Sequence, residues 1–482
     1  MIPVIRKLLL SASLGLAVTN GAYAMNMNLA VPWDNPPRCS PPQTPILTFY
    51  NRQNDTMLFD SGSKIEIYCQ AGLRCSTGMT YALHFNMVHT PFLTGKAEGL
   101  PANLFKITIN TDTLKPGFYD IRVKLDVGLE KVKFWPDGKE EPVQGVCTFG
   151  WKAGEMPLRD TRPADFRTFW DKAMADYQKI PLDAKIESEV RIFKGKEIDD
   201  YNVKSACLPP NYDPEGCKFN EVESFKISFA GPDGGRVYAW LAKPVGNGPF
   251  PAMLVLPGGG FAARPRPLEH ARHGYLAIDM QIHGQDVDLP KYELIPGHFD
   301  HVVYEPVDKH YYWNVYLRAA RAVDYICSRT DVDQKRIVTV GGSQGGRLSI
   351  VVPALDKRIA ATVPAINHAS NHPHWEWVEK CNKEPKSNGA DLTGAPEQPA
   401  TPEAICWSYY DPMNFAPDVK CPAFLNAGLI DPISPPYASF AAFRKLGSSD
   451  KTMVPLAGLG HDWSAEFDRS AWRWLNSKLN NK

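Results

Sequence analysis

The sequence predicts an α/β fold, a mostly parallel sheet with helices on both faces, preceded by an all-β sandwich-like domain. Two observations carry this prediction. From residue 223 to the C-terminus, apolar strand candidates alternate with helix candidates, which is typical of a parallel sheet covered by helices. Between residues 39 and 150, short alternating segments are separated by turn signals such as Asp60-Ser61-Gly62-Ser63, which is typical of an antiparallel sandwich.

The N-terminal segment has the pattern of a secretory signal peptide. A basic start precedes an apolar run over residues 8–18, and Ala22-Tyr23-Ala24 supplies a small-residue cleavage site. The run is too short to span a bilayer, and a buried N-terminal helix is the alternative. Met25 rather than Cys follows the expected cut, so no lipid anchor is indicated. We therefore expect residues 1–24 to be removed and the mature protein to be exported, either periplasmic or secreted.

Length and composition indicate two globular domains. The chain has 482 residues, of which 44% are hydrophobic, which is enough for sizeable cores. We place a β-sandwich (Ig-like) domain at 25–153 and a catalytic α/β domain at 154–482. Lys plus Arg and Asp plus Glu each count 53, and no long basic run is present, so nucleic acid and membrane surfaces are excluded as expected partners.

The ten cysteines of an exported chain suggest disulfides, because exposed thiols are not kept reduced outside the cytosol. Spacing leaves the pairing open. The local candidate pairs are Cys69 with Cys75, Cys207 with Cys217, and Cys381 with Cys406. Cys327 and Cys421 are instead candidates for buried thiols. No Cys-x-x-Cys pair is present, which argues against a zinc ribbon or a redox motif.

The elements of the first domain are short strands. We expect them at 46–50, 64–69, 81–87, 104–109, 119–125 and 146–149. This domain carries no obvious chemistry, and a structural or packing role is favoured over polysaccharide binding or assembly.

The second domain begins with a helix near Thr161-Arg162-Pro163, because proline is favoured in the first helical turn. Strands are expected at 223–230, 237–244, 252–256, 275–280, 337–340, 360–364, 423–427 and 452–456. Long helices are expected at 311–328 and 464–479.

A sharp turn is predicted at Gly341-Gly342-Ser343-Gln344-Gly345. An apolar strand candidate precedes it and a helical segment, 348–355, follows it. This is the pattern of a nucleophile elbow, in which a strained strand-to-helix turn exposes a serine hydroxyl above the sheet. Only very small residues fit at Gly341 and Gly345, where backbone and side chain would otherwise collide. Ser343 is therefore the candidate nucleophile.

An activated serine needs a base and a carboxylate that orients the base. Asp431 and His461 each follow a predicted strand, in the chain order serine, acid, histidine. Alone, either residue is more often a turn former or an ordinary polar residue. Behind an elbow, the two together favour a catalytic triad. His283 is an alternative base, but it precedes the nucleophile. The backbone amides of Gln344 and of the Gly258-Gly259-Gly260 loop are candidate oxyanion donors.

These motifs resemble the acetylxylan esterase and cephalosporin-C deacetylase family of α/β-hydrolases. The family's Gly-Gly-Ser-Gln-Gly-Gly motif corresponds to residues 341–346. The segments 410–417 and 428–431 resemble the family's acid segment, and Gly460-His461-Asp462 stands where the family has Gly-His-Glu. The resemblance covers about residues 160–482. It implies a serine carbohydrate esterase that deacetylates xylan or xylo-oligosaccharides through an acyl-enzyme, often as a homo-oligomer. No cofactor or metal is expected.

The sequence departs from the family at three places. Pro257-Gly258-Gly259 replaces His-Gly-Tyr, so the second oxyanion amide, which by the resemblance is that of Gly259, lacks an aromatic side chain. Trp375, Trp377 and Phe261 are candidates to refill the space that this aromatic leaves. Residues 280–285 replace a segment that carries Asp and Arg in the family. The sandwich-like domain is an addition to the compact family members.

Three other interpretations of the sequence are less favoured. An exported peptidase of the prolyl-oligopeptidase kind, or another serine esterase, shares the fold, but Gly342 and Gln344 rather than aromatic residues flank the serine. A carbohydrate-binding module with a decayed hydrolase conflicts with the complete set of serine, aspartate and histidine. A metal site at His368, His372 and His374 is less favoured than a loop that lines the active site.

Overall fold

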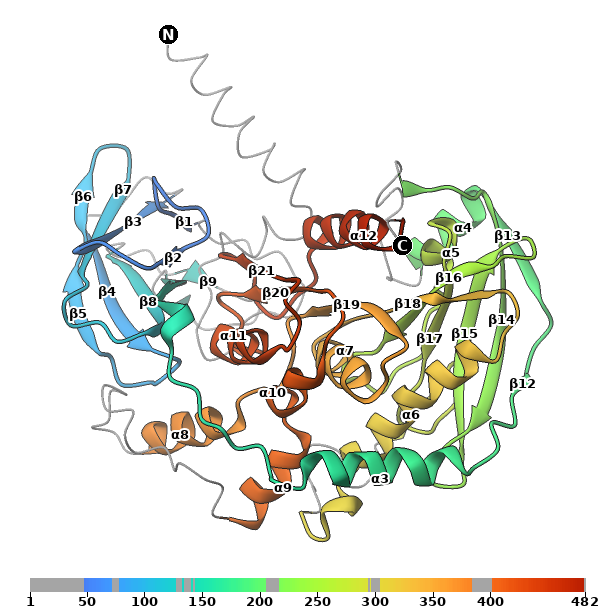
Figure 1. Ribbon diagram of the computed structural model, residues 1–482. Helices are drawn as coiled ribbons and strands as arrows, with labels where there is room; N and C mark the ends of the chain where they lie inside the picture. The colour runs from blue at the N-terminus through green and yellow to red at the C-terminus, as the bar shows by residue number, and fades with distance from the viewer. Residues whose placement is uncertain are drawn as a thin grey trace.

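The computed structural model describes residues 47–71, 78–126, 132–133, 140–141, 144–204, 216–293, 295, 304–383 and 401–480. Smaller sheets formed by the first part of the chain lie beside a ten-stranded sheet that helices cover on both faces (Figure 1). The expected signal peptide, residues 1–24, lies outside the described residues. Within the described part, no helix is both long and apolar enough to cross a bilayer.

The N-terminal region is built from two mostly antiparallel sheets. The first has the strand order β1 (Leu47–Tyr50), β3 (Lys64–Ala71), β7 (Leu104–Asn110) and β6 (Glu98–Leu100). The second has the order β2 (Leu58–Phe59), β11 (Gln144–Trp151), β8 (Gly117–Asp126), β4 (Gly78–Phe85) and β5 (Leu93–Lys96). β9 (Val132–Lys133) pairs antiparallel with β10 (Glu140–Glu141), and a 3-10 turn, η1 (Ala153–Glu155), follows β11.

The two sheets enclose one apolar core, because alternate residues of their strands point inward. Ile67 and Ile107 of the first sheet and Ile121 and Phe149 of the second are fully buried in the same cluster. The predicted sandwich-like region is therefore confirmed as a fold. Its division from the second domain at residue 153 stays a prediction.

The ten-stranded sheet has the strand order of an α/β-hydrolase. Its order is β12 (Lys185–Ile186), β14 (Glu221–Ala230), β15 (Arg236–Pro244), β17 (Leu276–Met280), β16 (Phe250–Leu256), β18 (Val332–Gly342), β19 (Ile359–Ala365), β20 (Ala423–Gly428) and β21 (Lys451–Leu456), with β13 (Arg191–Lys194) paired to β14. The strands from β17 to β21 in this order are parallel, and those before them are antiparallel. The predicted fold class is confirmed.

Helices cover both faces of this sheet, because the strands are apolar on both sides. One face packs on α3 (Phe166–Gln178), α6 (Tyr311–Cys327), α7 (Gln344–Leu355) and α11 (Pro436–Lys445). The other face packs on α4 (Lys196–Lys204), α5 (Leu268–Arg272) and α12 (Ala465–Asn480). The remaining described helices are α8 (His372–Lys383), α9 (Pro402–Tyr410), α10 (Pro412–Phe415), η3 (Val307–Lys309) and η5 (Ala416–Asp418).

The sandwich shares its apolar core with the α/β part of the chain. The ring of Phe85 in β4 lies 6.3 Å from that of Trp377 in α8, and Phe118 in β8 lies 5.0 Å from Phe440 in α11. Figure 1 shows the sandwich beside these two helices. Trp377 is therefore buried against the sandwich, and the expectation that it refills the space near Gly259 was wrong.

The predicted disulfides are not formed among the described cysteines. Cys406 is a buried free thiol, so the expected pair with Cys381 is absent. Burial raises the pKa of the Cys406 thiol to about 12. The other two candidate pairs each include a residue outside the described part, Cys75 or Cys207. Sequence spacing misled here because it gives only the length of a loop, not the direction in which two side chains point.

Candidate active site

Ser343 sits at a strained turn between β18 and α7. Its backbone angles are φ 59° and ψ −120°, in a region that residues other than glycine rarely adopt. A Cβ at Gly341 would lie 2.6 Å from the carbonyl oxygen of Leu256, and one at Gly345 would lie 2.1 Å from the same atom. These close approaches explain both glycines, because the end of β16 lies beside the turn, with Leu256 in register with Gly341.

The third glycine of the motif has a separate role. A Cβ at Gly346 would lie 2.3 Å from the carbonyl oxygen of Ala365, at the end of β19. Gly346 therefore lets the first turn of α7 pack against the neighbouring strand. The Ser343 amide also donates to Ala365, at 3.0 Å, so β16 and β19 hold the turn from two sides.

The structure brings Ser343, His461 and Asp431 together in one hydrogen-bonded series. Nε2 of His461 lies 3.0 Å from Oγ of Ser343. Nδ1 of His461 lies 2.9 Å from Oδ2 and 3.1 Å from Oδ1 of Asp431. This arrangement allows the imidazole to accept the hydroxyl proton while the carboxylate orients the opposite ring nitrogen.

Backbone amides fix the carboxylate of Asp431. Its Oδ1 accepts from the amides of Ile433 and Ser434, both at 2.8 Å, and its side chain is 0% exposed. The loops that carry Asp431 and His461 touch directly, because a Cβ at Gly428 would lie 2.5 Å from the carbonyl oxygen of Leu459. The imidazole of His461 is 20% exposed. The site is therefore rigid at the acid and open to solvent at the base.

Gln344 links the turn to the glycine loop after β16. Its backbone amide lies at the N-terminus of α7, where amides and the helix dipole favour negative charge. Its side-chain Nε2 donates to the Gly258 carbonyl at 3.3 Å, and its Oε1 accepts from the Tyr312 hydroxyl at 3.1 Å. The loop that contains Gly259 is thus tied to the residue after the nucleophile. The oxyanion role of the Gln344 and Gly259 amides stays a prediction.

The alternative base, His283, takes part in a different contact. Its ring stacks on Phe261 with centroids 4.2 Å apart, and Nδ1 hydrogen-bonds to the Tyr311 hydroxyl. The ring nitrogen that contacts Ser343 belongs to His461.

The three clustered histidines, His368, His372 and His374, have different surroundings. The backbone amide of His368 donates to the Ser343 carbonyl at 3.1 Å. The ring of His372 stacks on Trp407 at 4.9 Å, and that of His374 lies 4.1 Å from Tyr437. Burial lowers the pKa of each of these histidines to about 3, so they are neutral.

The loop from β19 to α8 is strained beside the nucleophile. Ile366, Ala369 and Asn371 have positive φ angles of 37°, 57° and 60°. The buried carboxylate of Asp411 accepts from the amides of Asn371 and His372 at 3.1 and 2.7 Å, which holds the end of this loop in place. Such strain persists only where surrounding contacts over-determine the backbone, as at functional sites.

Sequence reasoning missed Arg347, a charged residue buried behind the nucleophile. Its side chain is among the largest fully buried ones, and its guanidinium lies 3.8 Å from the centroid of the Tyr312 ring. Nη2 donates to the Tyr410 carbonyl at 2.8 Å. Its charge also contributes to the lowered pKa of His368. The sequence does contain a signal for this residue, because an arginine inside an otherwise apolar helix is expected to be buried and therefore to need a buried hydrogen-bond partner.

A cluster of Cys217, Glu269 and His273 was also missed. Their potential ligand atoms lie within 4.8 Å of one another, and within the described residues it is the group with metal-ligand spacing. Glu269 already accepts from Asn202 at 2.9 Å and from Arg272 at 3.3 Å. These contacts neutralise and occupy the carboxylate, so the cluster is explained as an internal ion-pair network.

Comparison with known proteins gives a consistent set of relatives. The family model Acetyl xylan esterase (AXE1) matches residues 193–478. The acetyl esterase Axe7A of Xylanibacter ruminicola is 24% identical over 389 residues, which cover 76% of this chain and 75% of that protein.

One solved structure supports the α/β fold by its similarity to this chain. The acetyl xylan esterase 1 of Thermoanaerobacterium sp. JW/SL YS485 superposes with a TM-score of 0.50 at 19% identity, over 66% of this chain and 95% of that one. The acetyl xylan esterase of Paenibacillus sp. R4 gives a TM-score of 0.48 at 24% identity, over 66% and 96% of the two chains. At 19% identity, the similarity to the Thermoanaerobacterium enzyme supports the fold alone.

Proposed function

Because the chain belongs to the acetyl xylan esterase family, we propose that it removes acetyl groups from acetylated xylan or xylo-oligosaccharides, with Ser343 as the nucleophile. Membership of this family, together with the acetyl esterase relative, indicates that the protein hydrolyses esters. The observation that carries the serine mechanism is the hydrogen-bonded series from Ser343 through His461 to Asp431.

In the first half of the proposed reaction, Nε2 of His461 takes the proton of Ser343 as Oγ attacks the acetyl carbonyl carbon. The negative charge that develops on the carbonyl oxygen is stabilised by the amides of Gln344 and Gly259. His461 then returns the proton to the departing sugar oxygen. This step leaves an acetyl ester on Ser343 and releases a free sugar hydroxyl.

In the second half, His461 takes a proton from water, which attacks the acetyl-serine carbonyl carbon. Collapse of the tetrahedral intermediate breaks the bond to Oγ, returns a proton to Ser343 and releases acetate. Asp431 keeps the Nδ1 hydrogen of His461 directed toward itself in both halves, so that Nε2 alternates between accepting and donating. The partly exposed edge of His461 supports this scheme, because water needs access to the base.

The test compares three substrate classes with the purified protein. We expect acetate release from acetylated xylan and acetylated xylo-oligosaccharides, and no cleavage of a panel of proline-containing peptides. Peptide cleavage without acetate release would replace the proposal with the peptidase alternative. A fluorophosphonate probe that fails to label the folded protein would instead favour a decayed hydrolase.

A further inference from the structure

A connected series of polar contacts lies behind the nucleophile, and the proposed reaction does not use it. The series begins at the guanidinium of Arg347 and passes through the side chains of Tyr312 and Gln344. It ends at the carbonyl oxygen of Gly258, in the glycine loop after β16. Tyr312 and Gln344 are only 2% and 1% exposed. Polar side chains buried this deeply are costly unless they are hydrogen-bonded, so each contact in the series is expected to matter.

The side-chain amide of Gln344 has one possible orientation. The Gly258 carbonyl only accepts hydrogen bonds, so the NH₂ group of Gln344 faces it, and Nε2 lies 3.3 Å from that oxygen. Oε1 is thereby turned to the hydroxyl of Tyr312, which donates to it at 3.1 Å. Burial raises the pKa of Tyr312, so this hydroxyl keeps its proton and remains a donor. Both ends of the Gln344 amide are therefore held.

Arg347 fixes the ring of Tyr312. Its guanidinium lies over the ring, 3.8 Å from the centroid. The guanidinium is itself anchored, because Nη2 donates to the Tyr410 carbonyl at 2.8 Å and Nε donates to the Tyr316 hydroxyl. A planar guanidinium that stacks on an aromatic ring sets the plane of that ring. The buried arginine thus determines where the Tyr312 hydroxyl lies.

The glycine loop is loosely packed and needs such an anchor. A Cβ at Gly258 would meet nothing closer than 4.0 Å, and one at Gly260 would meet nothing within 4 Å. Glycine adopts both signs of φ, so a peptide between two glycines turns over easily. A peptide is planar and trans, so its carbonyl and its N–H point in opposite directions. The contact of the Gly258 carbonyl with Gln344 therefore directs the N–H of Gly259 away from the buried Gln344 side chain.

We propose that Gln344 and Tyr312 are positioning residues, whose side chains hold the peptide after Gly258 so that its N–H faces the oxyanion. Gln344 then acts twice, with its backbone amide as one donor and its side chain as the support of the other. A peptide that turns over presents its carbonyl oxygen instead, which repels the developing negative charge. The inference rests on the proposed function, because an oxyanion forms only if Ser343 attacks an acyl carbonyl.

Gln344→Glu tests the support through a pH profile. A protonated carboxyl offers the same two contacts as the amide, an O–H for the Gly258 carbonyl and an oxygen for the Tyr312 hydroxyl, whereas a carboxylate only accepts. The ratio of kcat for the variant to kcat for the wild type is measured on p-nitrophenyl acetate from acidic to neutral pH. We expect this ratio to fall about tenfold per pH unit above the pKa of the introduced carboxyl. A carboxylate that merely raised the pKa of His461 would make the ratio rise with pH.

Tyr312→Phe tests the other end of the series. It removes the hydroxyl that holds Oε1 of Gln344 and keeps the ring under the guanidinium of Arg347. We expect kcat to fall about tenfold at unchanged KM, because the loss arises only in the transition state. This is less than the loss of about 100- to 1,000-fold that removal of a whole oxyanion donor causes, since the Gly259 amide is still present.

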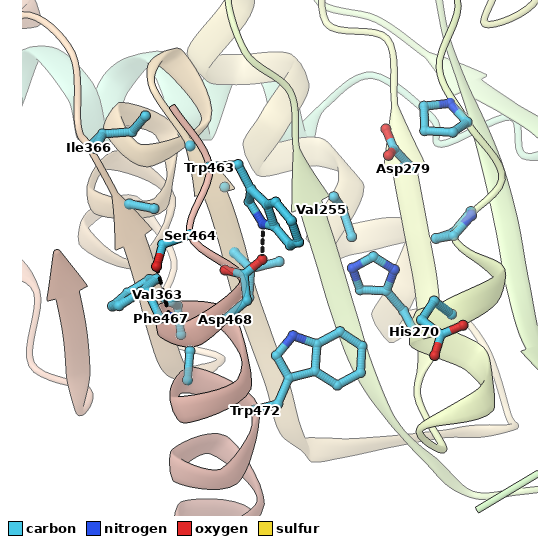
Figure 2. A pocket seen from close by; sticks show the side chains of 18 of the residues that line it. Val255, His270, Asp279, Val363, Ile366, Trp463, Ser464, Phe467, Asp468 and Trp472 are labelled. Atoms are coloured by element: carbon cyan, nitrogen blue, oxygen red, sulfur yellow. Dashed lines mark hydrogen bonds between the residues drawn. The ribbon is translucent and has the colours of Figure 1, made fainter. Parts of the chain in front are cut away.

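The matched control is Tyr275→Phe, which removes the same kind of contact at a distance from the site. The hydroxyl of Tyr275 donates to the side-chain oxygen of Asn476 at 3.2 Å, and the ring is buried between the sheet and α12. Figure 2 shows this face of the sheet, where Val363 and Phe467 belong to the same apolar cluster as Tyr275. The control is expected to keep the wild-type kcat.

The melting temperature of each variant shows whether it is folded. A wild-type kcat in folded Tyr312→Phe, or a Gln344→Glu ratio that stays constant or rises with pH, overturns the positioning role. Fluorophosphonate labelling separates this inference from the proposed function, because phosphonylation of Ser343 needs the oxyanion donors but no acetyl ester. If the wild type is labelled but releases no acetate from xylan, the proposed function is refuted. Slower labelling of Tyr312→Phe than of the wild type then still supports the positioning role, and equal labelling rates refute it.

Discussion

Replacing Asp431 with asparagine tests how the acid orients the base. Oδ1 of Asp431 accepts from two backbone amides, so the asparagine carbonyl oxygen is expected to take that position. The asparagine NH₂ group then occupies the position of Oδ2, 2.9 Å from Nδ1 of His461. A donor at this place forces Nδ1 to become an acceptor, so Nε2 carries the hydrogen and can no longer take the proton of Ser343.

The expected loss follows from this wrong tautomer. The same exchange in a serine-protease triad lowers kcat about 10⁴-fold, which corresponds to about 5.4 kcal/mol of transition-state stabilisation. The assay is p-nitrophenyl acetate hydrolysis near neutral pH, with the melting temperature measured alongside. Asp356→Asn is the control, since Asp356 is buried at the opposite end of α7 and pairs with Arg358. If Asp431→Asn keeps more than about a tenth of wild-type activity, Asp431 does not orient His461.

Three further outcomes are expected. Phe440→Ala should destabilise the protein by about 3–5 kcal/mol, because it removes the ring that packs on Phe118 of the sandwich. Urea unfolding measures this loss, with Phe219→Ala, at an exposed phenylalanine, as the control. If the Phe440→Ala and Phe219→Ala proteins are equally stable, the sandwich and the α/β part do not share a core. The value of kcat/KM should fall about 10- to 200-fold per added methylene from acetyl to propionyl to butyryl esters; a flat series would mean that the Gly259 loop leaves the acyl pocket open. The exported protein should begin at Met25 on N-terminal sequencing, and an intact Met1 would contradict the signal peptide.

The arrangement of the sheet was predictable because its strands are apolar runs bounded by turn residues. β16 and β20 were expected within two residues of their observed ends, since both are continuous runs of apolar residues and most of their residues are buried. The short edge strands β12 and β13 were missed, because they are mostly exposed and have no apolar pattern. α5 was missed because five residues give no helical period.

The candidate site was predictable where a motif constrains the backbone. A Cβ at Gly341 or at Gly345 would lie only 2.6 or 2.1 Å from the Leu256 carbonyl oxygen, so the turn around Ser343 requires both glycines and could be predicted from them. The surroundings were not predictable, because they depend on which distant residues meet. The burial of Arg347 arises from packing between helices far apart in the chain, and Cys406 forms no disulfide with Cys381 for the same reason.

Ser343→Ala tests the central claim most directly. Acetate release from an acetylated xylo-oligosaccharide is measured for the variant and the wild type, after circular dichroism and the melting temperature establish that both are folded. Only the hydroxyl of Ser343 can carry the acetyl group in the proposed mechanism, so we expect release to fall by about a thousandfold or more. Substantial acetate release by a well-folded Ser343→Ala protein would contradict the account.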